Sequence, residues 1–415
     1  MRIIVVGGGI TGVSSALCLA RDNHDVTLID RIMPGDEDQT SFGNAGILAS
    51  AAVIPVSVPG LLSKVPKMWL DRDGPLFFNP IHLPGLLPWL LPFLRQATPE
   101  GVRKIAAGLT PLISDSVEQH EALAKGTDAA RYIQRGPYVY LYPSRADFEA
   151  ESLSWEIRKE HGFTWDEWDR DLLVDRDPHL GPDHNFGIAL HNHGWVTHPS
   201  AYCKALSEAF LSAGGTFERG DVVDLQPLED GQAKVTLAGG KEITAERVIM
   251  TTGVWSGQLA ERVGHKAMIQ AERGYHVVFV GANHRPPTPY MISNAKCAAT
   301  PMEPGMRIAG LAEFAPIDAP AKQTPYALIR RNAKRLYPDL EWESETSWMG
   351  RRPSTPDSLP LLGQSPKAPG VIFACGGQHL GLTMGPKVGR IAAGLATQRP
   401  ANLDTTPYRV ERFDA

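Results

Sequence analysis

The chain has 415 residues, of which 43% are hydrophobic and 21% charged, and its formal net charge is -5. A composition this ordinary, at this length, predicts a globular protein of two or three domains whose core needs no disulfides. No long basic stripe is present, which excludes nucleic acid as an expected partner. The four cysteines are far apart and form no C-x-x-C pair. We therefore expect neither a disulfide framework nor a metal site, and a reducing, cytoplasmic location.

The first thirty residues predict a strand, a glycine-rich turn, a helix and a second strand. Residues 3–6 form an apolar run, residues 13–20 place small and apolar side chains at helical spacing, and residues 26–29 are apolar again. This order is the beginning of a βαβ unit. Because the first strand follows Met1 and Arg2 directly, we expect no signal peptide.

The rest of the chain alternates helical and strand-like patterns without an internal repeat. Helices are predicted at residues 100–130, 201–213 and from about 388 onward. Strands are predicted at residues 137–142, 222–225, 233–237, 248–251, 275–280 (within a wider strand-like region from 272 to 312) and 371–374.

An apolar stretch from Leu76 to Leu94 combines many Leu, Phe and Trp residues with Pro80, Pro84, Pro88 and Pro92. Those prolines would interrupt the backbone hydrogen bonding that a membrane-spanning helix requires. The favoured interpretation is a buried or broken helical segment. The alternative is a contact with the membrane interface, where Trp and Phe are at home.

The turn after the first strand carries a G-x-G-x-x-G motif at Gly7, Gly9 and Gly12. Gly7 permits the tight turn, Gly9 allows a pyrophosphate to approach the backbone, and Gly12 allows the helix to pack closely on the strands. The helix N-terminus then faces the phosphates. Asp30 closes the second strand, where a carboxylate accepts hydrogen bonds from the adenosine ribose. The motif predicts a dinucleotide site and does not by itself distinguish FAD from NAD.

Two later segments also indicate a nucleotide site. The apolar strand 248–251 runs into Thr252-Gly253, an arrangement typical of strands that return to a nucleotide domain near the adenine. Residues 376–385 are rich in glycine and precede a helix. The N-terminus of that helix would stabilise negative charge on a reduced flavin ring.

Four motifs together resemble the DAO family of flavoproteins, which includes D-amino-acid oxidase, glycine oxidase and sarcosine oxidase. They are VVGGGITG with Asp30, TSFGNAG at 40–46, GRRPSTPDSLPLLG at 350–363 and GGQHLGLTMGP at 376–386. The likeness is nearest to bacterial D-amino-acid dehydrogenases, including those that act on cis-4-hydroxy-D-proline. It covers nearly the whole chain, strongly at both ends and weakly across about 60–180.

The resemblance implies an α/β fold with a Rossmann-like FAD-binding domain of the GR2 type. That domain is expected to be discontinuous, over residues 1–50, 195–265 and 346–415. An interleaved α+β substrate domain, over residues 51–194 and 266–345, is expected to contain a mostly antiparallel sheet.

The resemblance also implies that FAD is the cofactor. We expect it to be bound non-covalently, because Phe42 stands where some members attach flavin to a histidine and Cys375 lies upstream of the loop where others use a cysteine. The expected cofactor contacts come from the glycine turn, the 40–46 loop, the middle strands and the C-terminal turn: Gly7, Gly9, Ile10, Thr11, Gly12, Asp30, Arg31, Ser41, Asn44, Ala45, Gly46, Val222, Val223, Thr252, Gly253, Trp255, Gly377, Gln378, His379, Leu380, Gly381, Leu382 and Thr383.

In this family the arginine of a G-[LF]-R-P motif binds the substrate carboxylate. The corresponding segment here is Gly350–Pro353, so the resemblance implies this role for Arg352. A planar guanidinium suits it, because it binds a carboxylate through two parallel hydrogen bonds. Arg351 stands where the family usually has an apolar residue, and either arginine is a candidate anchor.

Several oxidases of the family place a tyrosine opposite the flavin on an earlier strand, and the corresponding residues 295–300 contain none. The pocket is therefore expected to be roomier, or Tyr275 or Tyr290 takes that place; Tyr275 is our catalytic candidate. His379 is a further candidate for contact with flavin or substrate, or else a loop histidine that is hydrogen-bonded to the backbone.

The implied reaction is FAD-dependent dehydrogenation of a D-amino acid, with hydride passing from the α-carbon to flavin N5, and cis-4-hydroxy-D-proline is the leading substrate. The alternatives are a sarcosine- or glycine-type amine oxidase that uses O2 and a non-catalytic FAD-binding subunit of a heteromeric dehydrogenase. We expect a quinone or other respiratory electron acceptor, with peripheral contact at the inner face of the membrane. The oligomeric state is left open.

Overall fold

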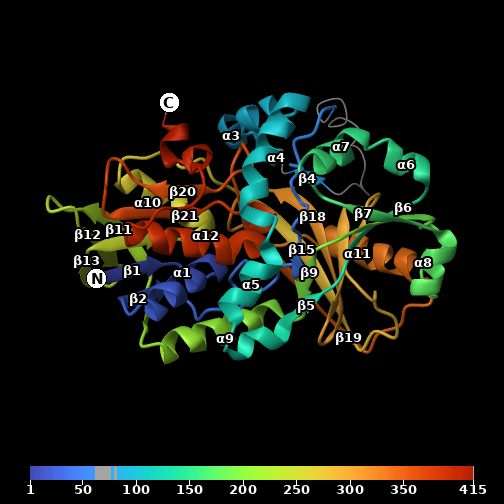
Figure 1. Cartoon of the computed structure of the whole chain (residues 1–415), viewed down its shortest axis with the longest axis horizontal. Coiled ribbons are helices and arrows are strands. Elements are labelled where there is room, and N and C mark those ends of the chain that lie inside the picture. The colour runs from blue at the N-terminus through green and yellow to red at the C-terminus, as the bar shows by residue number, and fades with distance from the viewer. Residues whose placement is uncertain (61–75, 79–81, 415) are drawn as a thin grey trace.

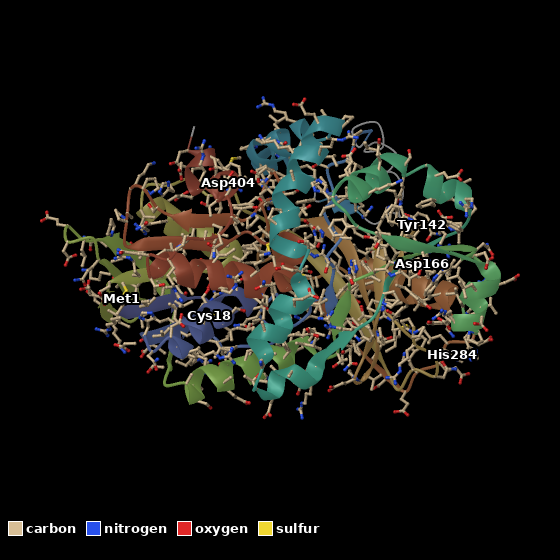
Figure 2. All side chains as sticks on the ribbon, viewed as in Figure 1. Met1, Cys18, Tyr142, Asp166, His284 and Asp404 are labelled. Atoms are coloured by element: carbon tan, nitrogen blue, oxygen red, sulfur yellow. The ribbon has the colours of Figure 1, made fainter. Side chains whose placement is uncertain are left out.

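The computed structural model describes residues 1–60, 76–78 and 82–414 of the chain. These residues form two lobes, one built on a six-stranded sheet and the other on a nine-stranded sheet (Figure 1). Figure 2 shows Cys18, on a helix of the first lobe, and Tyr142, on a strand of the second lobe, in opposite halves of the molecule.

The first lobe is organised by a mainly parallel sheet with the strand order β10-β2-β1-β14-β21-β20. Only β20 and β21 pair antiparallel within it. The apolar run of residues 3–6 is buried on both faces of the sheet, as a central parallel strand requires. The strands are β1 (Arg2–Val6), β2 (Asp25–Asp30), β10 (Thr216–Arg219), β14 (Arg247–Met250), β20 (Leu361–Gln364) and β21 (Val371–Cys375).

Two parallel helices, α1 (Ile10–Arg21) and α12 (Gly381–Ala396), pack side by side in this lobe (Figure 1). Glycines in α12 make this approach feasible: a Cβ at Gly385 would lie 2.9 Å from Ile10 Cγ1, and one at Gly389 would lie 2.6 Å from Ser14 Cβ. Moving four residues along α12, from Gly385 to Gly389, moves the contact four residues along α1, from Ile10 to Ser14, so the two helices run in the same direction. Their N-termini therefore lie at the same end of the lobe.

The second lobe is organised by a mostly antiparallel sheet with the order β19-β15-β18-β17-β16-β6-β8-β7 and with β4 beside β18. The β16–β6 and β18–β4 pairs are parallel. The strands are β4 (Leu76–Phe78), β6 (Tyr138–Tyr142), β7 (Trp165–Asp169), β8 (Phe186–Leu190), β15 (Gln270–Val280), β16 (Tyr290–Ile292), β17 (Cys297–Met302), β18 (Gly305–Phe314) and β19 (Ser344–Ser354).

The two faces of this sheet have different neighbours. Helix α11 (Gln323–Leu336) covers one face, where Ile329 packs in the same core cluster as Val277 and Phe279. The other face is turned to the first lobe, because His276 Nδ1 lies 3.0 Å from the carbonyl oxygen of Gly43 in the 40–46 loop. Side chains on this second face lie between the lobes.

The remaining elements connect and cover the two sheets. Two small sheets consist of β11 (Val222–Pro227), β12 (Ala233–Leu237) and β13 (Glu242–Ala245), and of β3 (Ile47–Leu48), β9 (Gly194–Val196) and β5 (Ile133–Arg135). The other helices are α3 (Leu83–Arg95), α4 (Pro99–Ile113), α5 (Ser116–Ala124), α6 (Arg145–Glu149), α7 (Ser152–Glu160), α8 (Arg170–Arg176), α9 (Pro199–Ser212) and α10 (Ser256–Arg262), with short 3-10 turns η2 (Asp128–Tyr132), η3 (Gly253–Trp255), η4 (Gln378–Leu380), η5 (Thr406–Tyr408) and η6 (Val410–Phe413).

The predicted fold class is confirmed, whereas the packing differs from the predicted domain limits at two places. Strand β19 begins at Ser344 and belongs over its whole length to the sheet of the second lobe, so the chain re-enters the first lobe only after residue 354. Helices α4 and α5 fall within the segment predicted for the substrate domain, yet Leu109 and Val117 pack in the core cluster of the first lobe with Val5.

Helix α3 contains most of the apolar, proline-rich segment; residues 79–81 of that segment lie outside the described residues. Its Trp89 is buried, packs on Phe314 with ring centroids 5.5 Å apart, and donates from Nε1 to the carbonyl oxygen of Ser354 at 2.9 Å. The opposite face of α3 exposes Leu87 and Leu91. The favoured interpretation, a buried helical segment, therefore holds for one face of α3. Among the described helices, none is long and apolar enough to cross a membrane.

Candidate cofactor and substrate site

Two glycines of the first turn are required by the protein's own backbone. Gly7 has φ of 105°, and a Cβ there would lie 2.6 Å from the carbonyl oxygen of Thr251. A Cβ at Gly12 would lie 1.8 Å from the carbonyl oxygen of Gly7. Both positions therefore allow β1, α1 and β14 to meet closely, as the sequence motif predicts.

Gly9 differs from these two, because the protein leaves space in front of it. The nearest described atom to a Cβ at Gly9 is Ser41 Oγ at 3.5 Å, an ordinary contact. Ser41 Oγ also accepts a hydrogen bond from Ile10 N at 3.0 Å, and the first turn of α1 contains no acidic side chain. The backbone from Gly9 to Thr11 therefore presents a helix N-terminus beside open space, which fits a pyrophosphate.

Asp30 lies at the end of β2, next to this turn. Its Oδ2 accepts hydrogen bonds from Gly8 N at 2.5 Å and from Gln39 Nε2 at 3.1 Å, which holds the carboxylate in place. Beyond it, the Arg31 guanidinium lies 4.1 Å from the centre of the Trp255 ring. This carboxylate and the stacked pair form a surface that suits the ribose and adenine of a dinucleotide.

The other residues predicted for the adenosine end lie close by. A register shift between Val222 and Asp224 leaves Val223 out of the β11–β12 ladder, so its backbone groups are available to a ligand. After β14, the Thr252 hydroxyl lies 2.9 Å from Ser256 Oγ, and a Cβ at Gly253 would meet nothing within 4 Å. Asp221, just before β11, lies 4.0 Å from Arg31, which places the start of β11 near the end of β2.

The start of α12 is the second glycine-lined end of the site. A Cβ at Gly381 would meet nothing within 4 Å, and the helix has no side-chain cap and no acidic residue in its first turn. Thr383 Oγ1 donates to Ile47 O at 3.2 Å, which ties α12 to the segment after the 40–46 loop. Because Leu380 and Leu382 are buried in the core, only their backbone groups are available to a cofactor.

The rest of this end is shaped by backbone and turn geometry. A Cβ at Gly377 would lie 3.0 Å from Gly381 Cα, and Gln378 has φ of 50° and donates from its side chain to Ser358 O. In the 40–46 loop, Asn44 Oδ1 accepts from Gly46 N at 2.8 Å and fixes the turn around Ala45. Two parallel helix N-termini, at α1 and α12, thus begin at the same end of the first lobe, each beside a glycine with little around it, and this arrangement fits FAD.

Arg307 is a buried residue beside the same loop that the sequence reasoning missed. Its Nη1 donates to Asn44 O at 2.5 Å, and burial lowers its pKa to about 10. Arg307 Nε and Thr300 Oγ1, on the paired strand β17, are buried, and among the described residues neither has a hydrogen-bond partner. These unpaired donors are available to a polar group between the lobes.

Arg352 lies on the face of the large sheet that is turned to the first lobe. The β15–β19 register places Glu272 directly opposite it, and Nη1 donates to Glu272 Oε1 at 2.7 Å. Ser354 Oγ donates to the other oxygen of Glu272 at 2.8 Å. Burial acts to raise the pKa of Glu272, but the Arg352 and His379 charges and these hydrogen bonds outweigh it, so the pKa lies below its usual range.

Two backbone carbonyl oxygens accept further hydrogen bonds from the terminal nitrogens of the Arg352 guanidinium. Arg352 Nη1 also donates to Leu311 O at 3.0 Å, and Nη2 donates to Gly310 O at 3.3 Å. Leu311 has φ of 58°, at a register shift between β15 and β18. This local turn lets two successive carbonyls face the same cation. Within the described part of the chain, Arg352 Nε and the second Nη2 hydrogen have no acceptor.

His379 lies in η4, close enough to Arg352 and Glu272 for their charges to act on it. Burial lowers its pKa; Glu272 opposes this effect and Arg352 reinforces it, so the net shift is downward. This shift favours the neutral imidazole, which can accept a hydrogen bond. The structure thus brings two of the three predicted catalytic residues together.

The third, Tyr275, points the other way, and this prediction is corrected. Successive residues of a strand alternate between faces, so Tyr275 lies opposite to Glu272 and Gly274. Its hydroxyl donates to Glu313, and its ring packs on Tyr326 of α11 with centroids 5.2 Å apart. Tyr290 lies in the same α11-side cluster, so neither tyrosine takes the position opposite a flavin.

Arg351 also lies on the other face of β19 from Arg352. Its Nε donates to Ile317 O at 2.8 Å, and its register partner on β15 is Arg273 rather than Glu272. The geometry therefore favours Arg352 over Arg351 as a carboxylate anchor.

The first lobe has a Rossmann-type sheet with a glycine turn, and the second lobe presents the guanidinium of Arg352 between the lobes. These two features are those of a two-domain, dinucleotide-dependent oxidoreductase. The comparisons make this class specific. The chain belongs to the DAO family, described as FAD dependent oxidoreductase, which matches residues 2–395, and FAD is accordingly its cofactor.

Relatives and solved structures agree over nearly the full length. The chain is 32% identical to a D-amino-acid oxidase of Bradyrhizobium diazoefficiens, over 99% of both chains, and 26% identical to D-amino acid dehydrogenase 1 of Mesorhizobium japonicum, over 100% of both. Its fold is similar to that of glycine oxidase from Geobacillus kaustophilus, with a TM-score of 0.74 at 22% identity over 99% of both chains. L-proline dehydrogenase from P. horikoshii gives 0.71 at 17%, over 100% of this chain and 97% of that one.

Proposed function

We propose that the protein dehydrogenates a free D-amino acid at the carbon that bears its amine. The observation that carries this proposal is the Nε–Nη2 edge of Arg352, which no acceptor among the described residues covers, on the sheet face between the lobes. The D-amino-acid oxidase and dehydrogenase relatives support the substrate class. An FAD-dependent oxidoreductase with an available guanidinium fork is suited to a substrate with a carboxylate.

In this mechanism Arg352 binds the carboxylate through two hydrogen bonds and so fixes the α-carbon. The substrate amine gives up its extra proton to solvent, and His379 then accepts a hydrogen bond from the neutral amine. FAD, when bound, would supply the acceptor for the α-hydrogen, which leaves as a hydride. Loss of that hydride from carbon and of a proton from nitrogen gives the imine, which water hydrolyses to the oxo acid and ammonia, or which persists as a cyclic imine when the amine is a ring nitrogen.

For the substrate itself we propose cis-4-hydroxy-D-proline or another D-amino acid with a bulky or secondary amine. Strand β17 carries the small residues Ala298 and Thr300 on the side of the first lobe, where Ala298 packs with Ile47. With Tyr275 and Tyr290 on the α11 side, no tyrosine of β15 or β16 occupies that position. The small side chains on this face support a ring substrate.

The test is the loss of catalytic efficiency in Arg352→Ala, assayed with a panel of D- and L-amino acids and an artificial dye. Truncating one partner of a buried charge pair costs about 2–5 kcal/mol, so kcat/KM should fall roughly 30-fold to several thousand-fold at about 1.4 kcal/mol per decade. Arg352→Lys should recover only part of the activity, because an ammonium group lacks the fork. Arg351→Ala is the matched control. A larger loss in the control than in Arg352→Ala would place the anchor at Arg351. Unchanged values in both would show that the substrate carries no carboxylate there.

For the electron acceptor we propose a quinone or another respiratory carrier, with O2 as the alternative that the oxidase relative favours. The exposed apolar face of α3, which includes Leu87 and Leu91, supports a docking role at a membrane surface. Turnover with a dye should greatly exceed turnover with O2, and Leu91→Glu should reduce co-sedimentation with phospholipid vesicles. Equal rates with stoichiometric peroxide would identify an oxidase instead.

A further inference from the structure

The guanidinium of Arg352 does not face the site as an isolated cation. Glu272 Oε1 lies 2.7 Å from its Nη1, and the side chains of both residues are largely buried, at 20% and 9% exposure. Glu272 is in turn held by Ser354 Oγ at 2.8 Å. A carboxylate-binding arginine that is already paired with an internal carboxylate requires a physical explanation, because the internal partner competes with the substrate for the same positive charge.

We propose that Glu272 is a positioning and specificity-determining residue: it holds Arg352 by Nη1, so that a substrate carboxylate meets only the Nε–Nη2 edge of a cation whose charge is already compensated. This inference rests on the proposed role of Arg352 as the carboxylate anchor.

The positioning follows from how completely the other side of the guanidinium is occupied. Both Nη1 hydrogens are used, by Glu272 and by Leu311 O, and one Nη2 hydrogen is used by Gly310 O. The guanidinium also lies flat over Gly274, because a Cβ there would lie 2.3 Å from Nη2, 2.4 Å from Cζ and 2.6 Å from Nε. The group therefore has little freedom to rotate, and the uncovered edge keeps one orientation. Glu272 supplies the charged member of this set, which is the strongest of the three contacts.

The specificity follows from the charge balance. A compensated cation attracts an anion mainly through directional hydrogen bonds, and net charge contributes less. Glu272 also repels a second negative charge and attracts the amine of a zwitterion. The pair therefore favours amino acids with neutral or cationic side chains over amine-free carboxylates and over acidic amino acids.

The experiment measures binding of an amine-free carboxylate, benzoate, to the FAD-loaded protein by calorimetry and by the change in flavin absorbance. Glu272→Gln keeps the shape of the side chain and removes its charge, so it should bind benzoate at least about fivefold more tightly than the unmodified protein. With the best D-amino acid as substrate, its kcat should fall about tenfold, because the anchor is held less firmly. A merely structural role would not tighten benzoate binding while lowering kcat.

Two variants serve as controls. Glu345→Gln breaks a Glu–Arg pair between β19 and α11, where Glu345 Oε1 lies 2.5 Å from Arg330 Nη2, and it should leave both quantities within about twofold. Arg352→Ala should abolish benzoate binding.

The outcomes separate the two claims. Weaker or unchanged benzoate binding in Glu272→Gln, together with loss of binding in Arg352→Ala, would overturn this inference and leave the anchor intact. Unchanged binding in Arg352→Ala would overturn the anchor itself. Thermal unfolding of each variant confirms that the folded protein is compared, and Glu272→Ala should show a larger loss of kcat than Glu272→Gln.

Discussion

Gly9 and Gly12 belong to one motif, but the structure assigns them different tasks, and substitution should separate those tasks. Gly9 has φ of -68° and ψ of 178°, extended values that any residue adopts. Of the residues that the structure describes, only Ser41 would contact a Cβ there, with its Oγ at 3.5 Å. Gly9→Val should therefore change the free energy of unfolding of the FAD-free protein by no more than about 1 kcal/mol. The added side chain instead occupies the space that a pyrophosphate would use.

The expected loss of FAD affinity follows from the hydrogen bonds that are displaced. Each hydrogen bond between a backbone N–H and a charged phosphate is worth about 1.5–3 kcal/mol. Losing one or two of them should raise the Kd for FAD about tenfold to several thousand-fold, at about 1.4 kcal/mol per decade. In contrast, a Cβ at Gly12 would lie 1.8 Å from Gly7 O, so Gly12→Val should prevent α1 from packing on β1 and the protein should not fold.

The assay compares FAD binding with folding in the same samples. FAD is removed with acid or denaturant, the refolded protein is titrated with FAD by flavin fluorescence, and unfolding is followed by circular dichroism. Gly239→Val is the control, since a Cβ there meets nothing within 4 Å and the residue lies outside the site. The reasoning fails if Gly9→Val binds FAD with normal affinity, or if Gly12→Val folds as well as Gly9→Val.

Three further outcomes are expected. Gly274→Ala should displace the guanidinium of Arg352, since a Cβ would lie 2.3 Å from its Nη2, and kcat/KM should fall while bound FAD is retained. Tyr275→Phe should leave kcat/KM within about threefold, because its hydroxyl lies on the α11 side; a much larger loss would return Tyr275 to the site. Burial lowers the pKa of His120 and of His193 to about 4, below the ordinary 6.5 that applies when the chain is unfolded. The unfolded state then binds more protons, so denaturant titrations should show stability falling from pH 6.5 toward pH 4, by up to about 3 kcal/mol for each histidine, with a flatter profile after His193→Gln.

The nucleotide-binding part of the fold could be predicted from the sequence because its determinants are local. An apolar run, three spaced glycines and a terminal acid lie within the first 30 residues, and the first and last of the glycines pack against each other there, because a Cβ at Gly12 would lie 1.8 Å from Gly7 O. The segments farther along the chain were harder to assign to a lobe. Helices α4 and α5 carry an apolar stripe that shows they are buried, and nothing in that stripe specifies which sheet they cover.

The substrate side was predicted less completely because it depends on strand register. Arg352 could be found from its motif, whereas Glu272 lies 80 residues earlier and becomes its partner only when β15 pairs with β19. The one feature of the sequence that could have indicated Glu272 is that it is an acidic residue inside a strand-like run. The prediction for Tyr275 was wrong because the face on which it lies also depends on this register. Tyr275 is three residues from Glu272, the partner of Arg352, and therefore lies on the opposite face of the sheet. The left-handed φ of Leu311 has no marker in the sequence, because leucine rarely adopts it.

Charge alone does not identify the anchor, because two neighbouring residues of β15 each form a buried ion pair, on opposite faces of the sheet. Glu272 pairs with Arg352 on the side of the first lobe, whereas Arg273 lies 3.4 Å from Glu313 Oε2 on the α11 side. Arg273 Nη1 also lacks a partner among the described residues, but the side chain is 0% exposed, so it is not accessible to a substrate. The side chain of Arg352 keeps 20% exposure and rests on a glycine. Buried ion pairs often add little to stability. The Glu272–Arg352 pair leaves the Nε–Nη2 edge of the arginine accessible. Recognition of an anion therefore explains this pair better than a contribution to the stability of the fold.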